Sequence, residues 1–225
     1  DKREFKDLDD SVELGTRNMK MALRRLRKFA RTGAADELDL DQTIKGTAHH
    51  GYLDIQMRPE RRNAVKVLMF LDIGGSMDDF IHRCEILFSA ARTEFKTLEF
   101  YYFHNCLYES VWADNRRRHT ERIPTWDVIH TYPSDYKVIF VGDASMSPYE
   151  IAVPGGSVEH MNPEPGTLWL QRALNQWPAS VWLNPVKDEY WQWTPSIDMI
   201  RKQFDGRMFP LTLDGLDRAI AELLR

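Results

Sequence analysis

Two stretches of the sequence end an apolar run on an aspartate that is closely followed by a serine. The first is VLMFLDIGGSMDD at residues 67–79, in which Asp72 precedes two glycines and Ser76. The second is FVGDAS, in which Asp143 precedes Ser145. If both runs are parallel strands, their carboxyl ends lie at the edge of the sheet where open α/β sheets bind ligands. Carboxylate and hydroxyl oxygens gathered there are the ligands that Mg²⁺ prefers, with water completing its shell.

A simpler interpretation of the first stretch is an ordinary turn from a strand into a helix. Gly74 and Gly75 would supply unusual backbone angles, and Ser76 would cap the helix. Catalytic alternatives lack their signatures, because the stretch has no GxSxG elbow and no Lys-Ser/Thr after its glycines. A phosphatase with an aspartate nucleophile would normally carry a second aspartate two residues further on. The second strand-end aspartate, Asp143, favours a metal site over a turn.

The elements that must position these residues alternate between strand and helix from residue 64 onward. Near-continuous apolar runs predict buried strands, and stripes at helical spacing predict helices between them. Strands are expected at 65–71, 97–112 (a hairpin around His104-Asn105), 136–141, 180–186 and 207–213. Helices are expected at 80–91, 125–132, 167–176, 197–204 and 214–225. This order predicts an α/β domain over residues 64–225 with a doubly wound, mostly parallel sheet flanked by helices.

Residues 1–63 have a different character and are predicted to form an N-terminal helix and extended arm. MALRRLRKFAR spaces Met21, Leu23, Leu26 and Phe29 along one face of a helix. The following stretch, ELDLDQTIKGTAHHGYLDIQMRPERR, alternates only weakly between apolar and polar residues. That pattern predicts extended backbone or short strands.

From residue 65 to the C-terminus, the sequence resembles a von Willebrand factor A (VWA) domain of the bacterial CoxE-like group. Domains of this kind carry a metal-ion-dependent adhesion site (MIDAS), written DxSxS after the first strand, with a threonine and a further aspartate on later loops. Asp72, Ser76 and Asp143 match the first, last and distal members, and Thr125 in RIPTWDVI is the best match to the threonine. Gly74 replaces the central serine, so water or a backbone carbonyl must fill that position. FVGDASMSPYEI, VWLNPV and RMFPLTLDGLDRAI resemble later parts of the same domain, and ELDLDQTIKGTA resembles the arm before it.

The resemblance implies one divalent cation, Mg²⁺ or else Mn²⁺ or Ca²⁺, held by Asp72, Ser76, Thr125 and Asp143. Gly74 and Gly75 would let ligand and backbone approach closely. The ion would keep one position open for an Asp or Glu of a protein partner, so we expect binding rather than catalysis. Proteins of the CoxE-like group work beside AAA+ ATPases of the MoxR class in metal-centre assembly or complex maturation, which implies such an ATPase as the partner.

The alternative function is a Mg²⁺-dependent hydrolase that uses the same site. It would need a general base near the metal, which only His104 or His160 could supply.

Two further sets of residues could contact a protein partner. Arg24, Arg25 and Arg27 lie in the basic N-terminal helix, where the simpler interpretation is a solvated helix face. Trp191 and Trp193 lie in a segment rich in tryptophan, where core packing is the simpler interpretation.

Composition excludes several classes of protein. Over 225 residues the formal net charge is −4, whereas nucleic-acid-binding domains are usually strongly basic. No apolar stretch approaches the roughly 20 residues of a membrane helix, and no signal peptide is evident, so a cytoplasmic protein is expected. Cys84 and Cys106 lack metal-type spacing and are expected to be reduced thiols. Because the sequence opens on Asp1, we expect a fragment or a processed form.

Overall fold

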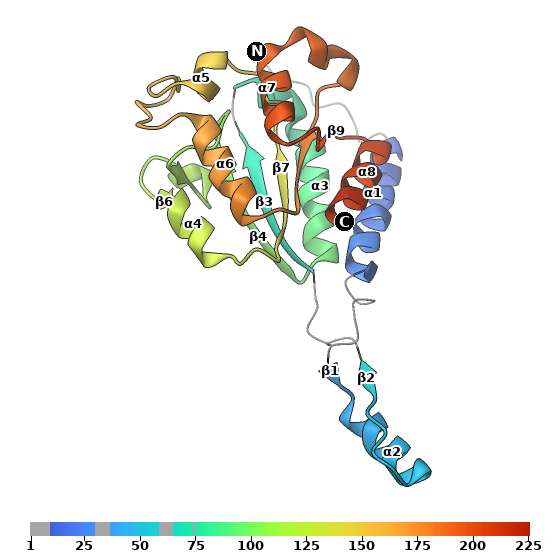
Figure 1. The fold of residues 1–225 in the computed structure, drawn as a ribbon. Coiled ribbons are helices and arrows are strands. Elements are labelled where there is room, and N and C mark those ends of the chain that lie inside the picture. The colour runs from blue at the N-terminus through green and yellow to red at the C-terminus, as the bar shows by residue number, and fades with distance from the viewer. Residues whose placement is uncertain (1–9, 30–36, 59–64, 74) are drawn as a thin grey trace.

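A five-stranded parallel sheet forms the centre of the fold (Figure 1). The structure is a computed structural model that describes residues 10–29, 37–58, 65–73 and 75–225. The strand order is β4-β3-β7-β8-β9, and every neighbouring pair is parallel. The strands are β3 (Lys66–Asp72), β4 (Thr97–Phe103), β7 (Lys137–Val141), β8 (Ser180–Asn184) and β9 (Met208–Pro210). The predicted α/β class with a mostly parallel sheet is confirmed.

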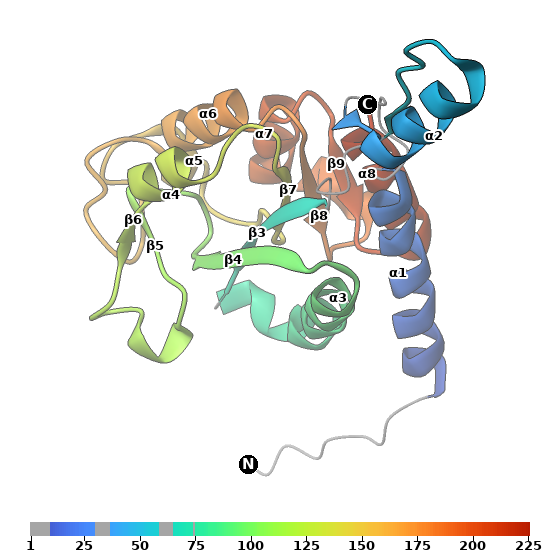
Figure 2. The ribbon, with the colours of Figure 1, turned by 90° about the horizontal axis from the view of Figure 1, so that it is seen from below.

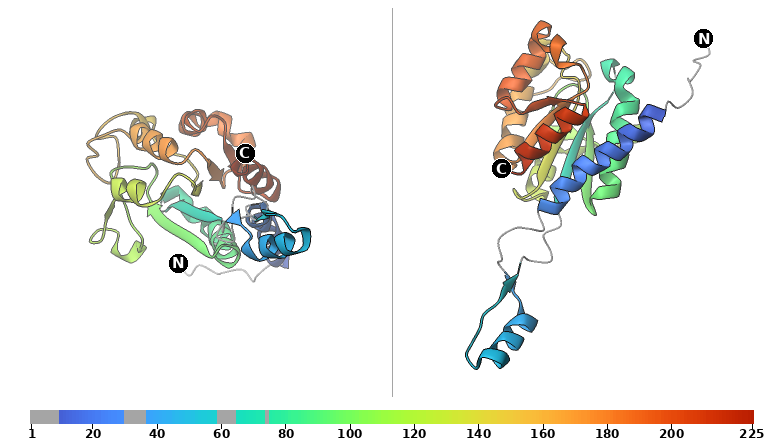
Figure 3. Two further views of the ribbon diagram at one scale, coloured as in Figure 1. Left: turned by 60° about the horizontal axis from the view of Figure 1, so that its bottom comes forward. Right: turned by 90° about the vertical axis from the view of Figure 1, so that its right-hand side faces the viewer.

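Helices cover both faces of this sheet (Figures 2 and 3). One face carries α1 (Asp10–Phe29), α3 (Ile81–Glu94) and α8 (Leu213–Leu223). The other carries α4 (Thr125–Thr131), α6 (Gly166–Gln176) and α7 (Pro195–Gln203). Successive side chains of a strand point to opposite faces, so in β3 Met69 and Leu71 pack on the first layer whereas Leu68 and Phe70 pack on the second. Burial on both faces explains why the strands were recognisable as continuous apolar runs.

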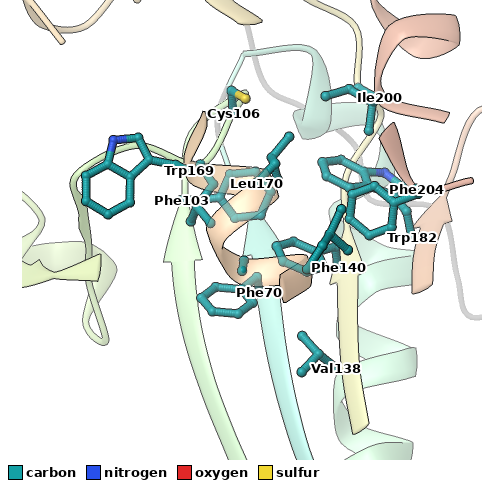
Figure 4. Packing of buried hydrophobic residues seen from close by; sticks show 14 of the residues in the cluster. Phe70, Phe103, Cys106, Val138, Phe140, Trp169, Leu170, Trp182, Ile200 and Phe204 are labelled. Carbon is teal, nitrogen blue, oxygen red and sulfur yellow. The ribbon is translucent and has the colours of Figure 1, made fainter. Parts of the chain in front are cut away.

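Aromatic side chains dominate the layer beneath α6 and α7 (Figure 4). The rings of Phe70 and Phe140 stack with centroids 4.8 Å apart, and Phe140 and Trp182 stack at 5.7 Å. Phe204 meets both Phe140 and Trp182 edge to face. The Trp182 indole N–H donates a 2.8 Å hydrogen bond to the carbonyl of Gly142, so this bond connects the aromatic layer to the loop after β7.

Shorter elements lie between these strands and helices. They are η1 (Gly75–Phe80), β5 (Ser110–Val111), η2 (Asn115–Arg117), β6 (Ile123–Pro124), α5 (Pro148–Ala152) and η3 (Asp188–Trp193). The turn predicted at His104-Asn105 is present, with Asn105 in the left-handed region at φ 57°. The chain then returns antiparallel, but it pairs only through two isolated bridges, His104 with Cys106 and Tyr102 with Trp112, so the return is not a full hairpin strand.

Helix α1 packs directly on the sheet domain. Met19, Leu23 and Leu26 are buried between α1 and the sheet layer of α3 and α8. The predicted apolar face is therefore correct for Leu23 and Leu26 but wrong for Met21, whose side chain is 59% exposed. The side chain of Phe29 lies outside the described residues.

Residues 37–58 form a separate projection, which we call the arm (Figures 1 and 3). It consists of β1 (Glu37–Leu38), α2 (Leu40–His50) and β2 (Met57–Arg58), with β1 and β2 antiparallel. The prediction of extended backbone was wrong for α2. Its signals are local: Asp39 caps the N-terminus by accepting from the Gln42 N–H at 3.0 Å, and Gly51 ends the helix in the left-handed conformation.

Candidate functional site

Asp72 ends β3 at the carboxyl edge of the sheet, where its side chain is buried. Its Oδ1 accepts a 2.9 Å hydrogen bond from the backbone N–H of Asn105, in the turn after β4. Its Oδ2 is buried without a hydrogen-bond partner. Buried polar atoms are almost always paired, so this carboxylate oxygen could accept a further donor or a cation.

The loop after β7 brings a second carboxylate to this point. Leu71 pairs with Val141 in the sheet register, so Asp72 is level with Gly142 and Asp143 follows directly. Gly142 permits this approach, because a Cβ there would lie 2.8 Å from the Asp72 Cβ and 3.1 Å from its Oδ2. The side chain of Asp143 is buried, and its Oδ1 accepts from the Ser145 N–H at 2.9 Å.

These surroundings disfavour the charged form of Asp72. Burial raises the pKa of Asp72 well above its ordinary value, and the negative charges of Asp143 and Glu150 raise it further. The Asn105 N–H opposes the shift by stabilising the carboxylate. A divalent cation at this point would reverse the balance, because it would neutralise the facing carboxylates.

Thr125 is the first residue of α4 and is fully buried. Its hydroxyl donates to the carbonyl of Tyr108 at 2.6 Å, which leaves the oxygen's lone pairs able to accept or to ligate. The Tyr108 hydroxyl donates to the Glu150 carbonyl, and the Glu150 carboxylate accepts from the Asn105 side chain at 2.8 Å. Since Asn105 also holds Asp72, a continuous chain of hydrogen bonds connects Thr125 to Asp72.

Ser76 lies in η1, directly after the end of β3, and its side chain is exposed. Gly75 precedes it with φ +58°, a conformation that favours glycine. Gly74, the residue that replaces the central serine of the motif, lies outside the described residues. The structure thus places three predicted ligands in buried positions and the fourth on an exposed loop at the same edge of the sheet.

Sequence reasoning missed Glu150 and Asn105, which support the site. Glu150 is buried in α5, where its Oε1 also accepts from the Ser147 N–H at 3.2 Å. The Ser147-x-x-Glu150 capping box was a readable signal for the start of α5. The contact between Glu150 and Asn105 spans 45 residues of sequence and had no local signal.

A cavity of about 290 Å³ opens beside Asp72, between η1, α3 and β4. Its wall is mostly apolar, but Asp72, Asp78, Glu85, Asn115 and Arg118 also line it. Arg118, whose guanidinium lies 3.7 Å from the carboxylate of Glu159, therefore borders the site. Cys84 lines the same cavity as a free thiol.

The two candidate general bases are both paired. His104 Nδ1 lies 2.8 Å from the carbonyl of Ile73 and its Nε2 lies 3.9 Å from Glu159. His160 Nε2 lies 2.7 Å from the carboxylate of Glu109. His104 is adjacent to the metal loop, because its Cε1 is the atom nearest to a Cβ built on Gly75, at 3.9 Å.

The arginines proposed as partner contacts form ion pairs within the chain. Arg24 lies 3.0 Å and Arg27 3.3 Å from the buried carboxylate of Glu94 in α3, and Arg25 lies 2.9 Å from Asp217 in α8. These pairs fasten α1 to both neighbouring helices. All three arginines remain partly exposed.

The two tryptophans proposed as partner contacts differ in burial. Trp191 packs in the core and donates its indole N–H to the Val186 carbonyl at 2.9 Å, so its ring does not face a partner. Trp193 is 75% exposed and remains available for one.

The donor set fits a hard cation rather than a thiophilic one. Across the described part of the chain, no group of three or more His, Cys, Asp or Glu could hold a metal ion. Asp72 and Asp143 with the hydroxyls of Thr125 and Ser76 offer only oxygens, which suits Mg²⁺, Mn²⁺ or Ca²⁺.

The parallel five-stranded sheet flanked by helices is consistent with a von Willebrand factor A or Rossmann-like α/β fold. A family model described as "VWA domain containing CoxE-like protein" matches residues 12–111. Residues 12–111 are therefore similar to VWA domain containing CoxE-like proteins, and the α/β fold is consistent with this similarity. The matched range includes α1, the arm and Asp72, but ends before Thr125 and Asp143. No curated protein and no solved structure was found to match the chain. Among the described helices, none is long and apolar enough to cross a membrane.

Proposed function

We propose that the protein is a metal-dependent interaction module that binds rather than catalyses. Asp72, Ser76, Thr125 and Asp143 would hold one divalent cation, Mg²⁺ in the first place, with Asp143 acting directly or through water. The observation that carries this proposal is the buried Asp72 Oδ2, which has no hydrogen-bond partner and lies beside a second buried carboxylate. Burying such a pair is costly unless a positive charge is added.

The chemistry supplied by the bound ion would be attraction for a carboxylate of another protein. Without the ion, an incoming Asp or Glu would meet Asp72 and Asp143, and like charges brought together while desolvated cost several kcal/mol. With the ion, the same carboxylate would complete the metal's coordination.

The resemblance to the CoxE-like group supports a MoxR-type AAA+ ATPase as this partner, in complex maturation or metal-centre assembly. The exposed Trp193, in η3 after β8, is a candidate contact outside the metal site. Its loop follows a strand whose carboxyl end lies at the same edge of the sheet as Asp72.

Calorimetric titration with Mg²⁺ and Mn²⁺, followed by binding of a purified MoxR-type ATPase with and without EDTA, tests the proposal. Asp72→Ala should abolish both metal and partner binding, and EDTA should reproduce this loss in the wild type. Asp79→Ala is a matched control, because Asp79 is an exposed acid of η1 that is not a proposed ligand. Partner binding that survives both EDTA and Asp72→Ala would place the interface elsewhere.

A hydrolase at the same site is the second candidate, and the position of His104 favours it. With Nδ1 donating to the Ile73 carbonyl, Nε2, which lies 3.9 Å from Glu159, would be the nitrogen that accepts a proton beside the loop after β3. Turnover of a phosphate or carboxylic ester with Mg²⁺ or Mn²⁺, lost in Asp72→Ala and in His104→Gln, would establish an enzyme. The binding proposal expects no turnover.

A further inference from the structure

The arm is held together by polar contacts on its inner side. The Thr43 hydroxyl accepts from the Gln56 N–H at 2.9 Å and lies 3.2 Å from the Gln56 carbonyl. The Thr47 hydroxyl, one turn further along α2, accepts from the Asp54 N–H at 3.0 Å. Gly46 lies between them, where a Cβ would collide with the Asp54 carboxylate. Helix α2 and the segment that leads from it to β2 therefore pack through small and polar groups.

The large apolar side chains of the arm point outward instead. Leu40 and Ile44, one turn apart on α2, are 59% and 57% exposed. In the segment that leads from α2 to β2, Asp54 and Gln56 face α2 whereas Leu53 and Ile55 are exposed at 71% and 57%. The exposed apolar set of the arm is Leu38, Leu40, Ile44, Tyr52, Leu53, Ile55 and Met57. A concentration of exposed apolar groups on a polar-stabilised scaffold marks an interaction surface.

A surface of matching character lies on the body of the same molecule. A groove of about 460 Å³ runs between α1 and α8, and we call it the α1–α8 groove. Its apolar lining includes Met21 and Leu213, which are 59% and 39% exposed, and its charged lining is Arg24, Arg25 and Asp217. Met21 belongs to the apolar pattern of α1 but is not buried by its own fold.

The two surfaces carry opposite charge. Residues 38–57 of the arm hold three aspartates against one lysine. On the groove side, residues 17–27 of α1 hold five arginines and lysines and no acid. Helix α8 holds Asp214, Asp217 and Glu222 against Arg218, and Glu94 pairs with Arg24 and Arg27, so these acids reduce the positive charge of this side without cancelling it. Asp41 is exposed next to Leu40, so an acid accompanies the apolar stripe of α2. Opposed charge steers association and fixes its register.

We propose that the arm of one copy docks in the α1–α8 groove of a second copy, with Leu40 and Ile44 against Met21 and Leu213 and with Asp41 toward the arginines of α1. The contact joins two different surfaces, so each copy offers one arm and one groove. Such head-to-tail contacts generate a closed ring when the rotation between copies closes, and an open chain otherwise. The oligomer forms independently of the metal site, which lies at the carboxyl edge of the sheet.

Sedimentation velocity over a range of concentrations tests the association. The wild type should form assemblies larger than a monomer, and raised salt should weaken them because the contact is partly ionic. Ile44→Asp should raise the dissociation constant about a hundredfold or more, because it buries an unpaired charge in the contact. Val158→Asp is the matched control, since Val158 is an aliphatic residue 70% exposed on the loop between α5 and α6. A monomeric wild type, or assemblies that Ile44→Asp leaves unchanged while the variant's circular dichroism remains native, would overturn the proposal.

Cysteine cross-linking identifies the two surfaces. A mixture of Met21→Cys and Ile44→Cys chains should give a cross-linked dimer on mild oxidation, whereas either variant alone should give far less. Exchanging Ile44→Cys for Val158→Cys should abolish the product. A cross-link that forms only within a chain carrying both substitutions would show that the arm covers its own groove, and absence of any cross-link would place the arm elsewhere. Either result would overturn docking between copies.

Discussion

Asp72→Asn should stabilise the metal-free protein while removing its response to metal. The asparagine is nearly isosteric, and its carbonyl can still accept the 2.9 Å hydrogen bond from Asn105. Its NH₂ group would replace the unpartnered Oδ2 and could donate to the neighbouring carboxylate of Asp143. The substitution therefore keeps the fold's contacts and removes the charge that the site holds for a cation.

The magnitude follows from the group that is left unpaired in the wild type. A buried polar atom without a partner costs about 1–3 kcal/mol, and more when it is charged. We therefore expect the free energy of unfolding in EDTA at neutral pH to rise by about 1–3 kcal/mol in the variant.

The pH dependence has a defined sign. Burial, aided by Asp143, raises the pKa of Asp72 well above its ordinary value. A carboxyl with a raised pKa contributes its full stability below its unfolded pKa, and this contribution is lost as the pH rises through the folded pKa. The advantage of Asp72→Asn in EDTA should therefore be largest at neutral pH and should shrink as the solution is acidified.

Urea denaturation in EDTA and in saturating Mg²⁺ measures both effects. A ligand at about one hundred times its dissociation constant stabilises the native state by about 2.7 kcal/mol, so Mg²⁺ should raise the stability of the wild type by that order. Mg²⁺ should leave the stability of Asp72→Asn unchanged. The difference in stability between the two proteins should therefore become smaller or change sign. Two results together would refute this reasoning: the variant is less stable than the wild type in EDTA, and Mg²⁺ does not stabilise the wild type. Asp72 would then be only a structural acceptor for the Asn105 N–H.

Three further predictions concern residues around the site and α1. Gly142→Ala should lower the free energy of unfolding in urea by about 1–3 kcal/mol, because the added Cβ overpacks the site. It should also weaken Mg²⁺ binding in calorimetry by displacing the Asp72 carboxylate, and an unchanged affinity would contradict this. Glu94→Gln should lower the free energy of unfolding in urea at pH 7 by about 1–2 kcal/mol. This is less than the loss of a fully buried ion pair would cost, because the arginine partners are half exposed. The hydrogen bond from Arg24 lowers the pKa of Glu94, so the contribution of Glu94 to stability is lost as the pH falls through its folded pKa. If the difference in stability between Glu94→Gln and the wild type did not depend on pH, the ion pair would not be its cause. Gly74→Ser should tighten Mg²⁺ binding in calorimetry by restoring a hydroxyl ligand, and equal or weaker binding would show that Gly74 serves the backbone.

The sequence by itself determined the α/β architecture and the two strand-end aspartates. Strands β3, β7 and β8 are buried on both faces, and such strands need apolar side chains at nearly every position. Asp72 and Asp143 each follow directly on such a run, and parallel strands align their carboxyl ends. Their proximity is therefore a consequence of local pattern and general topology.

Only the tertiary structure decided how these carboxylates are surrounded. Burial of Asp72, its orphaned Oδ2 and its support by Asn105 and Glu150 depend on turns that are 33 and more residues distant in sequence. Amphipathic spacing also did not determine which apolar residues are covered, because Met21 and Ile44 lie on helices but face solvent. Local periodicity reports the shape of an element, whereas burial depends on which other elements pack against it, and in this chain those elements come from distant parts of the sequence.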